Sequence, residues 1–339
     1  MRAVVLVGGF GTRLRPLTLT APKQMLPVVG VTMLERVVAK LAEAGVDEAV
    51  LSLGYRPDAF TAAFPEGSCA GVTLHYAVEP EPLDTAGAIA FAARDAGITE
   101  RFVAVNGDVL TDIDVAAQWA LHEERSAEGT IALTPVEDPS RFGVVPLQDD
   151  GRVEAFIEKP EPGTAPSNWI NAGTYVLEPS VLDRVEPGRR TSIEREVFPA
   201  MVEAGTLFGS QSDAYWIDAG TPEAYLAANL DYIDGRRGGS HPGVDPTARI
   251  SDGATVTHSV VGAGAVVAAG AVIEDSVVMS GVSIGTGAVV RGSIVGDGSV
   301  LGSGASVSGL SVVGTDVDVP PGAELHGERL PGPETWPPK

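Results

Sequence analysis

Residues 2–28 read RAVVLVGGFGTRLRPLTLTAPKQMLPV, and this stretch decides how the N-terminal part of the chain folds. It joins a short apolar run, typical of a buried strand, to a glycine loop that carries arginines and a lysine. The chain has a formal net charge of −22, yet its first acidic residue is Glu35. Because glycine lets a backbone approach a ligand closely, this carboxylate-free loop predicts a binding site for a highly charged anion.

Composition limits what that anion can be. The chain has 339 residues with 44% apolar and 20% charged content, which predicts a globular protein of two domains. Its 23 basic and 45 acidic residues argue against a nucleic-acid partner, since phosphate backbones need a basic face. The single cysteine, Cys69, excludes an intrachain disulfide and a cysteine metal cluster. The first apolar run is too short for a signal segment or a membrane span, so we expect a cytoplasmic protein with no membrane partner.

Apolar runs alternate with helically spaced stretches over residues 1–233. Strands are expected at 2–7, 48–53, 73–78 and 101–106, and helices at 34–44, 85–96 and 114–125. This alternation predicts an α/β domain of Rossmann-like, doubly wound type with a mostly parallel sheet. The glycine loop and Asn106-Gly107-Asp108 both follow a strand. They therefore lie where ligands collect in such folds, beyond the carboxyl ends of the strands.

The chain changes character after the glycine-rich linker 234–243. From residue 244 aliphatic residues recur in steps of six, six and five, which gives 17-residue repeats that begin at 256, 273 and 290. Such repeats predict a parallel β-helix, here over 244–325, followed by a C-terminal tail, 326–339. The flat faces and open ends of a β-helix favour self-association, so we expect a homo-oligomer.

Two common phosphate-binding loops are excluded by spacing. A P-loop needs Gly-Lys-Ser/Thr, and the chain contains no Gly-Lys. A dinucleotide fingerprint needs a third glycine where this loop has Leu14. Neither P-loop hydrolysis nor NAD chemistry is supported.

The order of several blocks resembles the nucleotide-sugar pyrophosphorylases, also called sugar-1-phosphate nucleotidyltransferases. The blocks are GGFGTRLRPLT with PKQMLPV, PLDTAGAI (82–89), NGDVL (106–110), FIEKP (156–160), NAGTYVL (171–177) and YWIDAGTPEAYL (215–226). Within this family the chain looks most like bacterial mannose-1-phosphate guanylyltransferases, which add a left-handed β-helix of hexapeptide repeats. The resemblance implies that a nucleoside triphosphate, here GTP, reacts with a sugar 1-phosphate, here mannose 1-phosphate, to give a nucleotide sugar and pyrophosphate.

The resemblance also implies catalytic residues. Arg13 would hold the departing β- and γ-phosphates, Lys23 would sit by the α–β bridge, and Lys159 would bind the attacking sugar phosphate. The chain has four lysines against nineteen arginines, and two of the four stand at these positions. Asp108 and Asp218 would hold Mg²⁺, which prefers one or two carboxylates together with phosphate oxygens. Arg15 either joins the anion site or forms a structural salt bridge.

Binding residues follow from the same blocks. The nucleotide would contact Leu6, Gly8, Gly9, Gly11, Thr12, Glu79, Thr85 and Gly107, and the sugar phosphate would contact Gly143, Glu158, Asn171 and Gly173. A carboxylate at Glu79 can accept from guanine N1–H and N2–H₂ together, which favours GTP. Asp84 stands where the family usually has glycine, which puts any close backbone contact there in doubt. Glu158 could instead pair only with Lys159 or Arg152.

Three alternatives remain open at this point. One is a thymidylyl- or uridylyltransferase that acts on glucose 1-phosphate. Another is a bifunctional enzyme whose β-helix transfers acyl groups, for which His258 would have to be the base. The last is a non-catalytic regulatory paralogue.

Overall fold

The computed structural model describes residues 1–54 and 56–337, and its contacts divide them between two compact units. Unit 1 comprises Met1–Gly9 and Leu34–Trp216. Unit 2 comprises Phe10–Met33 and the chain from Ile217 onward. The segment with Arg13 and Lys23 therefore groups with residues that follow it by about two hundred positions or more. Among the described residues no helix combines the length and the apolar character that a membrane span needs.

A twisted sheet forms the centre of unit 1. Strand β1 (Arg2–Leu6) pairs in parallel with β4 (Glu48–Leu53) and β7 (Phe102–Asn106), and β4 pairs in parallel with β6 (Val72–Val78). The Rossmann-like prediction is confirmed, with all four expected strands within one residue of their predicted ends. Beyond β7 the sheet becomes mixed: β12 (Trp169–Leu177) runs antiparallel to both β7 and β9 (Gly129–Pro135), and a further strand pairs with β9 in parallel. The other strands of this sheet are β5 (Ser68–Cys69), β10 (Gly143–Val144), β11 (Ile157–Glu158) and β13 (Leu207–Gln211), whereas β8 (Val109–Thr111) lies outside it.

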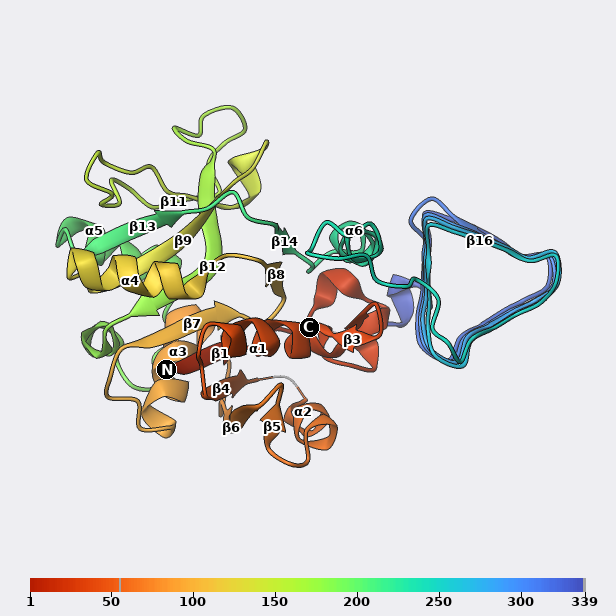
Figure 1. Ribbon diagram of the computed structural model, residues 1–339, viewed down its shortest axis with the longest axis horizontal. Coiled ribbons are helices and arrows are strands. Elements are labelled where there is room, and N and C mark those ends of the chain that lie inside the picture. Colours follow the sequence, from red (N-terminus) through yellow and green to blue (C-terminus); the bar gives the residue numbers. More distant parts are fainter. Residues whose placement is uncertain (55, 338–339) are drawn as a thin grey trace. The chain divides into compact units, whose positions relative to one another are not determined.

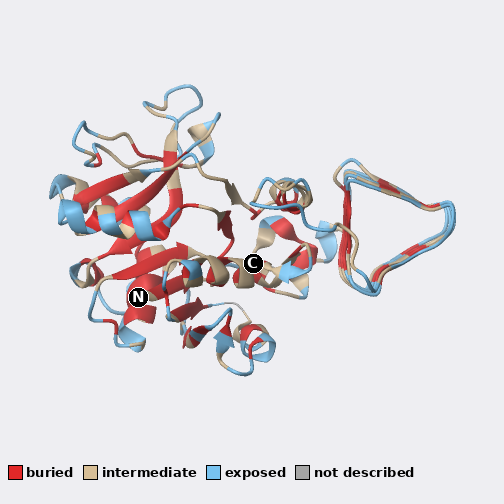
Figure 2. Ribbon diagram, viewed as in Figure 1, coloured by how far each residue is buried: buried red, intermediate tan, exposed pale blue. Residues whose placement is uncertain are grey.

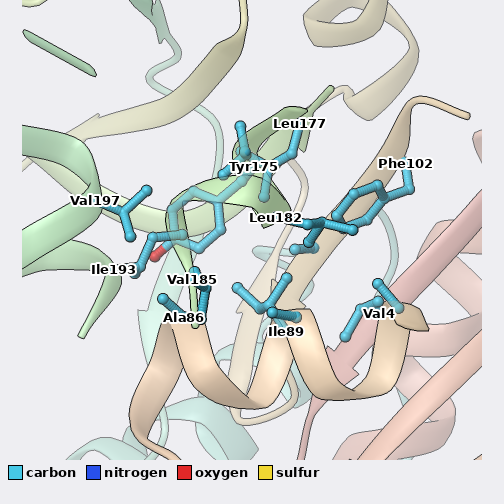
Figure 3. Packing of buried hydrophobic residues seen from close by; sticks show 14 of the residues in the cluster. Val4, Ala86, Ile89, Phe102, Tyr175, Leu177, Leu182, Val185, Ile193 and Val197 are labelled. Carbon is cyan, nitrogen blue, oxygen red and sulfur yellow. The ribbon is translucent and has the colours of Figure 1, made fainter. Parts of the chain in front are cut away.

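Helices cover this sheet as the periodicity predicts. The elements α1 (Met33–Glu43), α3 (Asp84–Asp95) and α4 (Val115–Arg125) correspond to the three expected helices, and α2 (Pro57–Ala63) and α5 (Phe198–Glu203) are additional. Helix α3 is lined with small residues, which lets Ile89 lie close to Phe102 and Leu182 in the core (Figure 3). Tyr175 packs edge-on against Phe198 in the same cluster. Burial of each such large side chain stabilises the fold by about 1.5–3 kcal/mol. The central strands β1, β4 and β7 are mostly buried, whereas α4 keeps one exposed side (Figure 2).

Unit 2 contains the β-helix, whose coils are triangular in end view (Figure 1). Strands from successive coils stack in register, so that Val256, Ile273 and Val290 form one inward-facing column. The predicted β-helix is thereby confirmed. Its three parallel sheets comprise β15 (Arg249–Ile250), β18 (Val266–Val267), β21 (Ser283–Ile284), β24 (Val300–Leu301) and β27 (Asp318–Val319); β16 (Thr255–Thr257), β19 (Val272–Glu274), β22 (Val289–Arg291), β25 (Ser306–Ser308) and β28 (Glu324–His326); β17 (Val260–Val261), β20 (Val277–Val278), β23 (Ile294–Val295), β26 (Val312–Val313) and β29 (Arg329–Leu330).

The β-helix extends further than the repeat suggested. Strand β29 pairs with β26, and Leu330 packs against the β-helix core, so strand pairing continues five residues beyond the expected end at 325. The expected tail from 326 includes these paired residues and a 3₁₀ turn at Pro333–Thr335. The periodicity missed this because the last coils depart from the six-six-five step. Lys339 lies outside the described residues.

Residues 10–33 are held in unit 2 by helix α6 (Pro222–Ile233), which follows strand β14 (Trp216–Asp218). The Tyr225 hydroxyl donates to the carbonyl of Pro27, and the backbone N–H of Val29 donates to Asn229 Oδ1 at 2.9 Å. Both contacts are made to a short hairpin formed by β2 (Pro27–Val28) and β3 (Val31–Thr32). Helix α6 therefore fixes the end of the segment that begins with the glycine loop.

Candidate functional site

Gly8, which follows β1, and Glu79, which directly follows β6, lie close together in unit 1. A Cβ added to Gly8 would lie 3.1 Å from Glu79 Oε1 and 3.4 Å from the backbone nitrogen of Gly54. A side chain at this position would therefore crowd the Glu79 carboxylate, which would have to shift by a few tenths of an ångström. Leu6, two residues earlier, ends β1 opposite Ser52 of β4 and Asn106 of β7. The exposed Gly9 is the last residue before the chain passes into unit 2.

Two donors from the protein orient the Glu79 carboxylate. The Ser52 hydroxyl donates to Oε1 at 3.0 Å, and the Leu83 N–H donates to Oε2 at 3.1 Å. A carboxylate oxygen has more than one lone pair, so each oxygen still has capacity to accept from a ligand. Sequence reasoning missed Ser52. A serine within the apolar run EAVLSL was the available signal, because a buried polar side chain needs a specific partner.

A second group of candidates follows β7 and the bulged part of β12. The Gly107 N–H donates to the Leu6 carbonyl at 3.0 Å, and Asp108 is only 8% exposed. Gly173 has φ +72° at a register shift of β12, and a Cβ there would lie 2.5 Å from Asn106 Nδ2. Asn171 is partly buried, and its side chain bonds to Gly173 N–H and the Tyr175 hydroxyl, both at 2.9 Å.

Glu158 and Lys159 form an ion pair at the end of β11. Lys159 Nζ lies 2.6 Å from Glu158 Oε1, and the lysine side chain is 60% exposed. Lys159 has φ +51°, a left-handed conformation that non-glycine residues rarely adopt and that is often found at functional sites. Gly143 is opposite Glu158 in the β10–β11 pair, and a Cβ there would lie 2.6 Å from the Phe156 ring. The Glu158–Lys159 pair considered from the sequence is therefore present.

The start of α3 uses Thr85 as a structural link. Its hydroxyl donates to Glu194 Oε2 at 2.7 Å and accepts from the Ile193 N–H at 2.8 Å. Asp84 has φ +61°, which accounts for glycine being the usual residue at this position, and its carboxylate accepts from the Thr85 N–H. Aspartate tolerates this conformation better than most residues. An ion pair of 3.7 Å joins Asp84 to Arg190.

In unit 2 the glycine loop packs on its own segment. Gly11 has φ +60°, and a Cβ there would lie 3.0 Å from Thr18 Cγ2 and 3.1 Å from Lys23 Cβ. The Thr18 hydroxyl donates to the Gly11 carbonyl at 2.8 Å, and Thr12 begins a single 3₁₀ turn that ends at Leu14. The backbone of Gly11 therefore lies so close to Lys23, the lysine named from the sequence, that an added Cβ would crowd it.

Arg13 faces Asp218 within the same unit. Arg13 Nη2 lies 3.7 Å from Asp218 Oδ2, while Asp218 Oδ1 accepts from the Gly220 N–H at 3.0 Å. The two side chains are 57% and 30% exposed. The carboxylates of Asp218 in unit 2 and of Asp108 in unit 1, each taken by itself, are hard oxygen donors of the kind that a divalent cation such as Mg²⁺ prefers. The chemistry of each carboxylate therefore fits a metal of this kind.

Arg15 is buried and has a structural contact. Its Nη1 donates to the carbonyl of Pro337 at 2.9 Å, so within residues 1–54 and 56–337 it bonds to the C-terminal segment and not to a carboxylate. His258 Nδ1 lies 2.5 Å from Asp275 Oδ1, and Nε2 lies 3.0 Å from Asp234 Oδ1. His258 is the residue that the acyltransferase alternative needs as its base. Both of its ring nitrogens are bonded to carboxylates, one at the end of α6 and one in the β-helix.

Burial raises the pKa of the Cys69 thiol to about 11, which keeps it protonated at neutral pH.

Comparisons with known proteins agree with this geometry. Residues 2–235 match the nucleotidyl transferase family, and residues 241–330 match the GMPPB C-terminal domain. A mannose-1-phosphate guanylyltransferase of Mycobacterium tuberculosis is 42% identical over 275 residues, which cover 78% of this chain and 75% of that protein. A mannose-1-phosphate guanyltransferase of Schizosaccharomyces pombe is 44% identical over 242 residues, which cover 70% of this chain and 66% of that protein.

A solved structure shows the same fold. The crystal structure of HddC from Yersinia pseudotuberculosis matches with a TM-score of 0.59 at 28% identity, and the match covers 68% of this chain and 99% of that one. A second structure of HddC, complexed with GMP-PN, matches with a TM-score of 0.58. The family match spans more than half of the chain, and it includes the glycine loop and all the candidate residues. This chain therefore belongs to the nucleotidyl transferase family and is a nucleotidyltransferase.

Proposed function

We propose that the protein transfers a guanylyl group from GTP to mannose 1-phosphate and releases pyrophosphate, forming GDP-mannose. The observation that carries the choice of base is the oriented carboxylate of Glu79 beside Gly8. Guanine presents two adjacent donors, N1–H and N2–H₂, which a carboxylate can accept together. Uracil and thymine present one donor, N3–H, between two carbonyl acceptors, and a glutamine side chain is better suited to this acceptor–donor–acceptor edge than a carboxylate. The similarity to two mannose-1-phosphate guanylyltransferases supports the choice of sugar.

The reaction requires two anions to approach each other. An oxygen of the sugar phosphate attacks the α-phosphorus, the new O–P bond forms, and the bond to the β-phosphate oxygen breaks with its electron pair leaving on pyrophosphate. Catalysis of such a step depends mainly on positioning and charge neutralisation. Arg13 is assigned to the β- and γ-phosphates, Lys23 to the α–β bridge, and Lys159 to the sugar phosphate. Each contact made more strongly in the transition state contributes about 3 kcal/mol.

An ion pair within the protein positions Lys159 before substrate binds. Its ammonium pairs with Glu158 at 2.6 Å, and this contact holds it next to the carboxylate assigned to sugar hydroxyls. A sugar phosphate would thus meet a cation for its phosphate and an acceptor for its hydroxyls from adjacent residues. Asn171 and the glycines at 143 and 173 are proposed to line the same sugar-phosphate site.

Nucleotidyltransferases of this family usually use a divalent metal, and we propose Mg²⁺ held by Asp108 and Asp218. When bound, the ion would neutralise phosphate charge and so lower the repulsion between the two substrates. Leu6, Gly8, Gly9, Gly11, Thr12, Thr85 and Gly107 are proposed to complete the nucleotide site. The homo-oligomer expected from the β-helix stays a prediction, which sedimentation velocity tests directly.

A substrate matrix tests the proposed function. Pyrophosphate release is measured with GTP, ATP, UTP and dTTP, each combined with mannose 1-phosphate and glucose 1-phosphate. We expect the pair GTP and mannose 1-phosphate to give the highest kcat/KM, and absence of turnover with GTP would reject the assignment. Lys23→Ala should abolish turnover without unfolding the protein.

Base recognition is tested at Glu79. Glu79→Gln replaces one acceptor oxygen by a donor NH₂, so kcat/KM for GTP should fall by about 10- to 100-fold, because a buried polar edge is left mismatched. Glu81→Gln, two residues further along and exposed, is the matched control and should match the wild type. If Glu79→Gln keeps full preference for GTP, Glu79 does not read the base.

A further inference from the structure

Arg329 lies 316 residues from Arg13 in the sequence and contacts its backbone. Arg329 belongs to β29, in the last coil of the β-helix. Its Nη1 donates to the carbonyl of Arg13 at 2.9 Å and to the carbonyl of Arg15 at 2.8 Å. One guanidinium nitrogen thus holds two carbonyls that flank Leu14, at the end of the 3₁₀ turn.

These two carbonyls are groups that the turn itself does not use. In the 3₁₀ turn the N–H of Leu14 donates to the Gly11 carbonyl and the N–H of Arg15 donates to the Thr12 carbonyl. The next carbonyls along the chain need donors from elsewhere, as at the end of any helical turn. A cation is well placed there, because the end of a turn is the negative end of its dipole.

The surrounding contacts hold Arg329 itself. Its guanidinium carbon lies 5.9 Å from the centroid of the Trp336 ring, and the Trp336 indole N–H donates to the Pro331 carbonyl at 3.0 Å. In the opposite direction, Arg15 of the loop donates to the carbonyl of Pro337 in the C-terminal segment at 2.9 Å. The C-terminal segment and the loop therefore bond to each other in both directions.

The side chain of Arg13 depends on this backbone for its position. Its guanidinium is more than half exposed, and its ion pair with Asp218 spans 3.7 Å, longer than a hydrogen bond. A long exposed side chain with so little packing is placed mainly by its own Cα. Whatever fixes the Arg13 carbonyl therefore limits where the guanidinium can reach.

We propose that Arg329 is a positioning residue for the triphosphate, and that the last coil of the β-helix orients the loop bearing Arg13. This inference rests on the proposed function, in which Arg13 binds the β- and γ-phosphates. It gives the β-helix a part in nucleotide binding within a single chain. Arg329 does not itself touch the reacting atoms in this scheme.

Steady-state kinetics of three variants test the proposal. Arg329→Ala should raise the KM for GTP about 10-fold and lower kcat, while the KM for mannose 1-phosphate stays as in the wild type. Arg329→Lys keeps the charge and donors on a shorter side chain and should recover part of the loss. Arg291→Ala is the matched control, because Arg291 is also a β-helix arginine but pairs with Glu274, and it should leave both KM values unchanged.

A double-mutant cycle with Arg13→Ala separates this proposal from the proposed function. If Arg329 acts through Arg13, Arg329→Ala should cost less than about twofold in kcat/KM once Arg13 is already alanine, since the two effects are not additive. An equal loss in both backgrounds, or a wild-type KM for GTP in folded Arg329→Ala, overturns the positioning role alone. Full activity of Arg13→Ala rejects the assignment of Arg13 and this proposal with it.

Discussion

Replacement of Gly11 by alanine tests the glycine loop most directly. Gly11 has φ +60°, so alanine there costs about 1–2 kcal/mol of backbone strain. The new methyl group would also lie 3.1 Å from Lys23 Cβ and 3.0 Å from Thr18 Cγ2. Carbon atoms in contact normally lie about 3.5–4.0 Å apart, so Lys23 must move by about 0.5 Å. A catalytic group must be held within about 0.5 Å of its productive position, and a displacement of 1 Å can lower the rate about 100-fold. A shift of Lys23 by about 0.5 Å lies at this limit, so we expect kcat to fall about 10-fold.

Gly30→Ala is the matched control for this variant. Gly30 lies in the same segment with φ +74°, but an added Cβ there meets nothing within 4 Å. It should therefore lose about the same 1–2 kcal/mol of backbone stability and keep wild-type kcat. At about 2–4 °C per kcal/mol, each variant should melt a few degrees lower.

Pyrophosphate release and thermal melting by circular dichroism give the two readouts. Reduced kcat in Gly11→Ala only, with both melting points lowered, supports a catalytic Lys23 placed by the loop. Wild-type kcat in Gly11→Ala would refute the reasoning, because the crowded lysine would then not matter for turnover. Equal loss of kcat in both variants would also refute it, because the loss would come from general loosening of the segment.

Three further predictions concern other parts of the chain. Val29 has φ +47° in a two-residue hairpin turn before Gly30, so Val29→Asn should stabilise the protein by about 1 kcal/mol, seen as a higher melting temperature with unchanged kcat. The hydrogen bond from His258 to Asp275 raises the histidine pKa, so the stability it contributes is full below about pH 6.5 and is lost as pH rises through the folded pKa. Melting temperatures of wild type and His258→Gln should thus converge from pH 6 to pH 8, and a constant gap would contradict the ionic bridge. Lys159→Ala should raise the KM for mannose 1-phosphate at least 10-fold while the KM for GTP holds; Lys40→Ala is the control, since that lysine pairs with Glu43 on α1.

Local patterns were enough to predict most secondary structure. Strand β1 and helix α3 follow from apolar runs and helical spacing, because neighbouring residues determine which face of an element is buried. The β-helix follows from the recurrence of Val256, Ile273 and Val290, since each coil repeats the environment of the one before it. The antiparallel pairing of β12 with β7 and β9 was not predicted, because strand direction depends on pairing between distant segments.

For the candidate site, too, the sequence predicted some residues, but their hydrogen-bond partners were seen only in the structure. Glu79 and Gly8 were named from the sequence, but the donors that orient the Glu79 carboxylate come from β4 and from the start of α3. Thr85 was expected at the nucleotide, and the structure shows its hydroxyl bonded to residues 193 and 194. Such pairings depend on the spatial position of single polar atoms, and no local pattern encodes them.

The sequence by itself determined that a carboxylate-free glycine loop follows the first strand. It also determined that a repeat with steps of six, six and five residues begins at residue 244. Both are properties of neighbouring residues, so they can be read along the chain. Only the tertiary structure decided that these two features bond to each other, through Arg329 and the carbonyls of Arg13 and Arg15. The physical reason is that a carbonyl left unused by a short turn accepts from whatever donor the fold brings to it. That donor is separated from the loop by more than three hundred residues of sequence.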